Sequence, residues 1–249
     1  MPENPPIIPI ELLETIDSTS LEARRRLASG PLRGPRALVA ARQTGGVGRF
    51  GRRWESPAGG LWMTVIWPLQ GPIGPRIEGM GLRLGLACAR AIEGVVPAHA
   101  VVTLKWPNDV LVNGLKVAGL LTEVVDSAAV VGVGVNANFD ASKLSEGLRS
   151  RATTLRTVTR GTVDLAALRD ALLHGFAAAL DVRGLDEESL EAVRARLHGV
   201  GEPAALRLGD GSTMRGTLLG IADDGRVRLR IGGAEALAPA GAELVVDQR

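Results

Sequence analysis

The sequence predicts an α+β protein in which a mixed, mainly antiparallel sheet packs against helices and is followed by a small all-β unit. Three observations support this class. Asn113-Gly114 is a hairpin signal in the middle of the chain, and apolar residues recur at helical spacing after Pro75 and after Asp164. Beyond Pro203, short apolar runs alternate with Asp-Gly and Gly-Gly pairs, which is typical of short strands.

Composition narrows the classes of protein and of site. The 249 residues are enough for one sizeable core with a small appendage. Lys and Arg number 29 against 27 Asp and Glu, so the net charge of +2 gives little support to nucleic-acid binding. One cysteine excludes an internal disulfide, and the three histidines do not have zinc-site spacing. We expect no signal peptide, no membrane span and a cytoplasmic protein.

The first third of the chain reads as short strands joined by polar turns. Residues 10–16, 37–41 and 61–67 are apolar runs of strand length. Between the first two, Thr19 and Glu22 have capping-box spacing, so a helix is predicted to begin there.

Residues 42–54 carry four glycines and four arginines, and we expect them to form a loop and no core element. Their backbone N–H groups and guanidinium groups could close over a phosphate or a carboxylate. A flexible, solvated surface loop is the alternative. The segment matches neither the P-loop pattern nor the dinucleotide-binding glycine pattern.

Residues 101–121 contain three charged side chains in an otherwise apolar, β-branched run. The two-residue Asn113-Gly114 loop fixes the register, with residues 105–108 as a rim at the strand end. The predicted cross-strand pairs are Val112 with Leu115, Leu111 with Lys116, Val110 with Val117, and Asp109 with Ala118. Asp109 and Lys116 then share one face as diagonal neighbours, roughly 7–8 Å apart. An acid and a base with a gap between them form a candidate reaction site, and a solvated surface hairpin is the alternative.

The rest of the chain completes this plan. Residues 130–136 read as a strand antiparallel to the preceding one, and helices are predicted from Asp164 and from Asp186. Residues 199–203 read as a linker, so the predicted domains are residues 1–199 and 200–249. About five short strands follow, and a unit this small is expected to lean on the first domain.

Several motifs together resemble those of biotin–protein ligases, in order and in approximate spacing. The resemblance covers nearly the whole chain, and Lys-Trp-Pro-Asn-Asp is its most specific part. The motifs are Asp17-Ser18-Thr19-Ser20, Gln43-Thr44 with the Gly/Arg run to Trp54, Lys105-Trp106-Pro107-Asn108-Asp109, Lys116-Val117-Ala118-Gly119 and Gly132-x-Gly134-x-Asn136. The resemblance implies a catalytic domain like that of class II aminoacyl-tRNA synthetases and an SH3-like C-terminal β-barrel. It is similar to the short form, without an N-terminal DNA-binding domain.

The implied activity has two steps. Biotin and MgATP give biotinyl-5′-adenylate, and biotin then passes to a lysine of the biotin carboxyl carrier domain of acetyl-CoA carboxylase or a related carboxylase. ATP, Mg²⁺ and biotin are therefore implied, the metal ligands stay unassigned, no DNA or membrane partner is expected, and a homodimer is left open.

The resemblance also implies roles for individual residues. Lys116 stabilises charge in both steps, and Arg49 clamps the adenylate. Asp109 accepts a proton from the acceptor amine or orients it, unless it merely pairs with Lys116. The biotin contacts are Ser18, Thr19, Ser20, Gln43, Gly46, Val47, Gly48, Arg49, Lys116, Gly119 and Gly134. The ATP and adenylate contacts are Arg49, Arg52, Trp54, Lys105, Asn108, Asn136 and Ala152.

Three positions depart from the family pattern, and two other functions stay open. Val47 replaces a usual Arg, Ser20 a usual Asn and Trp62 a usual Tyr, which bears on substrate affinity more than on reaction type. One alternative is a lipoate- or octanoate-transferring relative with the same catalytic fold. The other is a non-enzymatic module that binds nucleic acid.

Overall fold

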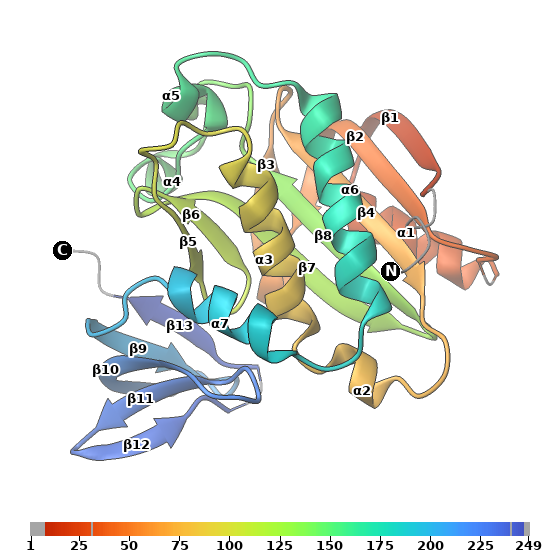
Figure 1. The fold of residues 1–249 in the computed structure, drawn as a ribbon. Coiled ribbons are helices and arrows are strands. Elements are labelled where there is room, and N and C mark those ends of the chain that lie inside the picture. The colour runs from red at the N-terminus through yellow and green to blue at the C-terminus, as the bar shows by residue number, and fades with distance from the viewer. Residues whose placement is uncertain (1–7, 31, 240, 247–249) are drawn as a thin grey trace.

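The computed structural model describes residues 8–30, 32–239 and 241–246. Its main sheet has the order β1-β2-β4-β8-β7-β6-β5, and β3 pairs with β2 (Figure 1). β1 and β2 run parallel, whereas the other pairs are antiparallel, so the predicted mixed α+β class is confirmed. The strands are β1 (Ile10–Ile16), β2 (Arg36–Val47), β3 (Arg53–Ser56), β4 (Leu61–Pro68), β5 (Val102–Lys105), β6 (Asp109–Val112), β7 (Leu115–Val125) and β8 (Ala128–Val135).

Helices cover both faces of this sheet. α3 (Met80–Glu93) and α6 (Leu165–Asp181) pack on one face and α1 (Thr19–Ala28) on the other (Figure 1). Alternation along β4 shows the division, because Val65 lies in the core with α3 and α6, whereas Ile66 packs with α1. Within the described residues, no helix is long and apolar enough to cross a membrane. The remaining helices are α2 (Gly74–Ile77), α4 (Glu146–Arg149), α5 (Leu155–Thr159) and α7 (Glu187–Arg196), with 3₁₀ turns η1 (Arg49–Gly51) and η2 (Ala141–Lys143).

The central hairpin has the predicted turn, but its strand pairing departs from the predicted register beyond Leu111 and Lys116. Asn113 and Gly114 both have positive φ, as a type I′ turn needs. A bulge between Val110 and Leu111 then pairs Val110 with Ala118 and Asp109 with Gly119, so the predicted pairings of Val110 with Val117 and of Asp109 with Ala118 are wrong. The bulge adds one residue to β7, an irregularity that the turn sequence does not encode.

Two other local predictions need correction. Ser18 is the N-cap of α1, because its Oγ accepts the Leu21 N–H, and Thr19 is the first helical residue. β2 continues to Val47 and pairs with β3, so most of residues 42–54 form a hairpin and only residues 48–52 lie between strands. The tight pairing needs glycine, since a Cβ at Gly46 would lie 2.5 Å from the Trp54 carbonyl oxygen.

The C-terminal sheet has five antiparallel strands in the order β12-β11-β10-β9-β13. β12 and β13 lie at opposite ends of this order, so the predicted closed barrel is not confirmed. As expected, the unit leans on the rest: Leu206 and Leu218 share one core with α3, and Trp106 Nε1 donates to the Gly225 carbonyl at 3.2 Å. Its strands are β9 (Pro203–Arg207), β10 (Thr213–Ile221), β11 (Val227–Ile231), β12 (Ala234–Leu237) and β13 (Glu243–Val246).

Candidate active site

A cavity of about 560 Å³ lies between the main sheet, the loop of residues 48–52 and the C-terminal sheet. This volume is typical of a small-molecule site. Every residue that the sequence nominated lines it except Gly46, which pairs with Trp54 across β2 and β3. The nominated residues that line it are Ser18, Thr19, Ser20, Gln43, Val47, Gly48, Arg49, Arg52, Trp54, Lys105, Asn108, Asp109, Lys116, Gly119, Gly134, Asn136 and Ala152.

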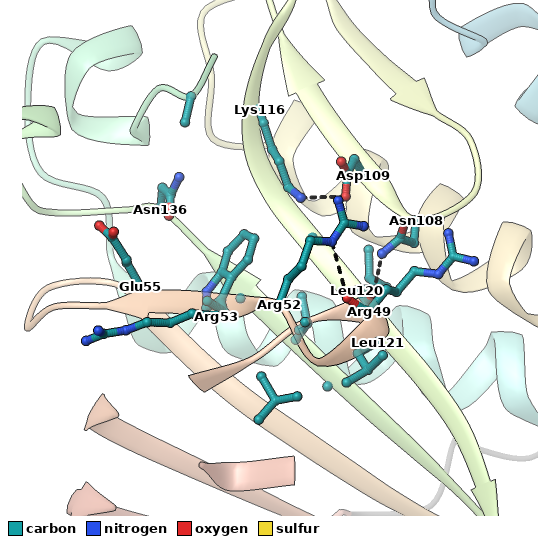
Figure 2. Close-up of a pocket in the computed structure, with 18 of the residues that line it drawn as sticks. Arg49, Arg52, Arg53, Glu55, Asn108, Asp109, Lys116, Leu120, Leu121 and Asn136 are labelled. Carbon is teal, nitrogen blue, oxygen red and sulfur yellow. Dashed lines mark hydrogen bonds and ion pairs between the residues drawn. The ribbon is translucent and has the colours of Figure 1, made fainter. Parts of the chain in front are cut away.

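Lys116 and Asp109 project into the cavity from the same face of the hairpin (Figure 2). Lys116 Nζ lies 2.7 Å from Asp109 Oδ1, and the two side chains are 30% and 19% exposed. The predicted gap between the two groups is therefore wrong, because the flexible lysine side chain closes it. The observed arrangement is the alternative in which Asp109 pairs with Lys116.

The backbone and the aromatic neighbours of Lys116 hold it firmly. Its N–H donates to the Arg151 carbonyl and its carbonyl accepts the Thr153 N–H, each at 2.9 Å. Lys116 Nζ lies 4.9 Å from the centroid of the Trp54 ring, a cation–π contact. Glycine makes this possible, since a Cβ at Gly119 would lie 3.1 Å from both the Trp54 ring and Lys116 Cε.

Residues 48–52, the arginine loop, close one side of the cavity and are tied to the C-terminal sheet. Arg52 Nη2 lies 2.6 Å from Glu243 Oε1. Arg49 Nη2 donates to the carbonyls of Gly241 at 3.4 Å and Ala242 at 3.3 Å. Burial lowers the pKa of Arg49 while Glu243 opposes this shift, and an arginine so placed stays charged.

Some polar side-chain atoms of residues that line the cavity make no hydrogen bond in the described part of the chain. Arg49 Nη1, Trp54 Nε1 and Glu243 Oε2 are buried and make no hydrogen bond there. Unsatisfied buried polar atoms are rare in folded proteins. The two donors, Arg49 Nη1 and Trp54 Nε1, are groups that oxygen atoms of an anionic ligand would satisfy, whereas Glu243 Oε2 lies 3.8 Å from Arg207 Nη1 in an ion pair.

Lys105 and Asn108 lie at the β5–β6 turn and differ in their surroundings. Asn108 Nδ2 donates to the Leu120 carbonyl at 2.6 Å, so its amide orders the hairpin. The Lys105 ammonium has no hydrogen bond or ion pair to any described residue. Burial lowers the pKa of Lys105, Asp109 opposes this, and Lys116 lowers it further. Lys105 is therefore a cation available to a bound anion.

Polar side chains at the start of α1 connect to two strands beneath it. Gln43 Oε1 accepts the Thr19 N–H at 2.7 Å and the Thr19 hydroxyl at 3.0 Å. Behind them, Thr64 on β4 is fully buried and donates to Thr19 Oγ1 at 2.8 Å. Thr64 also lies 3.1 Å from Ser20 Oγ.

Asn136 and Ala152 brace the wall next to Lys116. Asn136 is buried, and its Nδ2 donates to the Thr153 carbonyl at 3.2 Å. Ala152 forms a bridge with Lys116. Both residues line the cavity, but their side chains show packing and backbone support, and their contacts to a nucleotide stay predictions.

Sequence reasoning missed several lining residues. Arg207, Glu243 and Val245 come from the C-terminal sheet, and His198 comes from the segment before it. No local pattern marks them, because they reach the site only through long-range packing. In the described residues, no group of three His, Cys, Asp or Glu side chains could hold a metal ion.

Comparison with known proteins gives consistent matches. A family model described as the biotin/lipoate A/B protein ligase family matches residues 12–140. The biotin–[acetyl-CoA-carboxylase] ligase of Paracoccus denitrificans is 35% identical over 94% of this chain and 96% of its own. The bifunctional ligase/repressor BirA of Bacillus spizizenii is 29% identical over 66% of this chain and 55% of its own. The chain spans about half the length of the two Bacillus proteins that it matches.

A solved structure supports the same relationship. The biotin protein ligase from Aquifex aeolicus in complex with biotin and ATP has a TM-score of 0.82 and 29% sequence identity. The match covers 97% of this chain and 100% of that chain.

Proposed function

Because the chain belongs to the biotin/lipoate A/B protein ligase family, we propose that it is an ATP-dependent biotin–protein ligase. The observation that carries this proposal is the pair Lys116 and Asp109, which face a cavity also lined by Arg49 and Arg52. The relatives named for biotin, matched over most of both chains, support biotin over lipoate as the substrate. We expect the reaction to take place in the cytoplasm, where ATP is available.

In the first step, the biotin carboxylate attacks the α-phosphorus of ATP. The new C–O–P bond forms as the bond to the β-phosphate breaks, and pyrophosphate leaves. Two anions approach each other here, so fixed cations are needed. Lys116 lies closest to the reacting oxygens in this proposal, and Arg49, Arg52 and Lys105, whose ammonium has no partner among the described residues, neutralise the phosphates.

In the second step, a lysine amine of the biotin carboxyl carrier domain attacks the mixed anhydride, AMP leaves and the amine loses a proton. An ordinary lysine has a pKa of about 10.4, so freeing its amine at pH 7 costs about 4–5 kcal/mol. Asp109 holds Lys116 in place before substrates bind, and it orients the incoming amine or accepts its proton when Lys116 turns to the substrate.

Mg²⁺ fits this site as part of the substrate MgATP. Mg²⁺ usually keeps several waters and binds through substrate phosphates with one or two carboxylates. Asp109 and Glu243 line the cavity, but each is paired with a cation, which argues against a resident metal site.

We also propose that residues 1–199 form the catalytic domain and residues 200–249 an SH3-like domain. The five short antiparallel strands and the turn at residues 198–202 support this division. The absence of a DNA partner stays a prediction, and a homodimer stays open.

The test uses the full chain, ATP, a biotin carboxyl carrier domain, and radiolabelled biotin or lipoate in parallel reactions. We expect biotin to become attached to the carrier only when ATP is present, with release of one pyrophosphate and one AMP. Transfer of lipoate without transfer of biotin would overturn the proposal. Salt-sensitive DNA binding with no nucleotide-dependent biotin binding would favour the nucleic-acid module instead.

A further inference from the structure

The buried hydroxyl of Thr64 has no role in the chemistry above, yet it lies directly behind the end of the cavity where α1 begins. Thr64 is on β4 with no exposed surface, and it contacts Thr19 and Ser20, which both line the cavity. The four side chains Ser20, Thr64, Thr19 and Gln43 form one continuous set of hydrogen bonds, here called the hydroxyl chain.

The direction of every hydrogen bond in the hydroxyl chain follows from one fixed donor. The Thr19 backbone N–H can only donate, so Gln43 presents its oxygen, and its Nε2 turns to Ser56 Oγ at 2.8 Å. Gln43 Oε1 therefore also accepts the Thr19 hydroxyl hydrogen. Thr19 Oγ1 is then left as an acceptor, and it receives the hydrogen of Thr64.

This order also fixes the direction of the hydrogen bond between Thr64 and Ser20, the last member of the hydroxyl chain. A hydroxyl has one hydrogen, and Thr64 donates its hydrogen to Thr19. In the 3.1 Å contact between Ser20 and Thr64, Ser20 must therefore be the donor. Ser20 Oγ then has no hydrogen left for a ligand, and its remaining lone pairs can accept a hydrogen bond from one. Ser20 also lies close to the sheet, since a Cβ at Gly132 would come within 2.7 Å of its Oγ.

We propose that Thr64 is a positioning residue that fixes the Ser20 hydroxyl as a hydrogen-bond acceptor, so that the cavity selects a substrate ring with an N–H at this place. This inference rests on the proposed function. A cyclic urea such as that of biotin offers such a donor, whereas the dithiolane of lipoate and the alkyl chain of octanoate have none. A site whose buried polar group is left unpaired rejects such analogues.

The test compares binding of biotin with binding of two lactam analogues, each of which carries CH₂ in place of one ureido N–H. Kd is measured by calorimetry on the full chain without ATP. For the wild type, we expect one of the two analogues to bind about 10-fold to 100-fold more weakly than biotin, as for a lost buried hydrogen bond.

Thr64→Val keeps the shape of the side chain but frees the Ser20 hydrogen. We expect its Kd and KM for biotin to rise about tenfold with kcat changed less than about threefold, because the reacting carboxylate lies at the other end of biotin. The ratio of the Kd for the sensitive analogue to the Kd for biotin should fall to about threefold or less. Thr64→Ser should restore both the affinity and the ratio. Ser20→Ala should lower the ratio in the same way, which keeps the test valid if Thr64→Val does not fold.

Thr103→Val is the matched control. Thr103 on β5 also has a buried hydroxyl, but that hydroxyl makes no hydrogen bond within the described chain and the residue does not line the cavity. The substitution Thr103→Val should leave the Kd for biotin unchanged. An unchanged analogue ratio in Thr64→Val and Ser20→Ala would overturn the inference, as would a Thr64→Ser protein as impaired as Thr64→Val. Failure of the proposed function looks different, because the wild type would then bind lipoate and not biotin.

Discussion

Replacing Lys116 with methionine tests the centre of the proposed chemistry. The substitution keeps the length and much of the apolar stem of the side chain but removes the ammonium, which lies 2.7 Å from Asp109 Oδ1 in the cavity wall. Two unit charges about 4 Å apart interact by about 4 kcal/mol at an effective dielectric constant of about 20. Since about 1.36 kcal/mol corresponds to a tenfold rate change, loss of this interaction would slow the reaction by at most about a thousandfold. We therefore expect Lys116→Met to slow adenylation by about two to three orders of magnitude.

Biotin-dependent exchange of pyrophosphate into ATP measures this step without the carrier domain. Lys143→Met is the control, because Lys143 is exposed in η2 and does not line the cavity. Loss of an ion pair whose side chains are 30% and 19% exposed should cost about 1 kcal/mol of unfolding free energy. The Tm should then fall by only a few degrees. A correctly folded Lys116→Met protein that exchanges pyrophosphate within about tenfold of the wild type would refute the role of Lys116.

Two further predictions concern the arginine loop and the pH dependence of stability. Arg49→Gly removes the hydrogen bonds to the Gly241 and Ala242 carbonyls, so the adenylate should escape and biotinylate lysines of a bystander protein. Blotting with labelled avidin would detect this biotinylation. Unchanged selectivity for the carrier domain would contradict the role of Arg49 as a clamp. The hydrogen bond from Arg25, followed by that from the Ser18 N–H, lowers the pKa of Asp17 from 3.8 to about 2. This carboxylate therefore stabilises the fold fully above pH 3.8 and loses its contribution as the pH falls towards 2. Asp17→Asn should lower the unfolding free energy in urea by less than about 1 kcal/mol at pH 7, because both partners are about half exposed, and a difference that persists at pH 2 would contradict this.

Much of the fold follows from local sequence. Asn113-Gly114 encodes its own turn, and the alternation of side chains on either side of it places Lys116 and Asp109 on one face. α6 and α7 begin after Asp164 and Asp186, whose carboxylates accept backbone N–H groups as N-caps. These features depend on neighbours in the chain, so a single sequence predicts them.

Other features depend on contacts between distant segments. The bulge that moves Asp109 opposite Gly119 leaves no mark in the turn sequence. Arg52 and Glu243 are 191 positions apart, so nothing near either residue shows that they meet. Thr64 reads simply as a strand residue, and its position behind Ser20 emerges only when α1 lies across β4.

The tie between the arginine loop and the C-terminal sheet has a consequence for protein synthesis. A nascent chain that has emerged to Val200 already holds Lys116 and Asp109, but Arg52 has no Glu243 to meet and Arg49 has no carbonyls at residues 241 and 242. One wall of the cavity is also still in the ribosome. The wall of the site is therefore complete only after residues 241–243 have been made and have folded against the arginine loop, and we expect a chain interrupted before them to lose the adenylate of the proposed reaction.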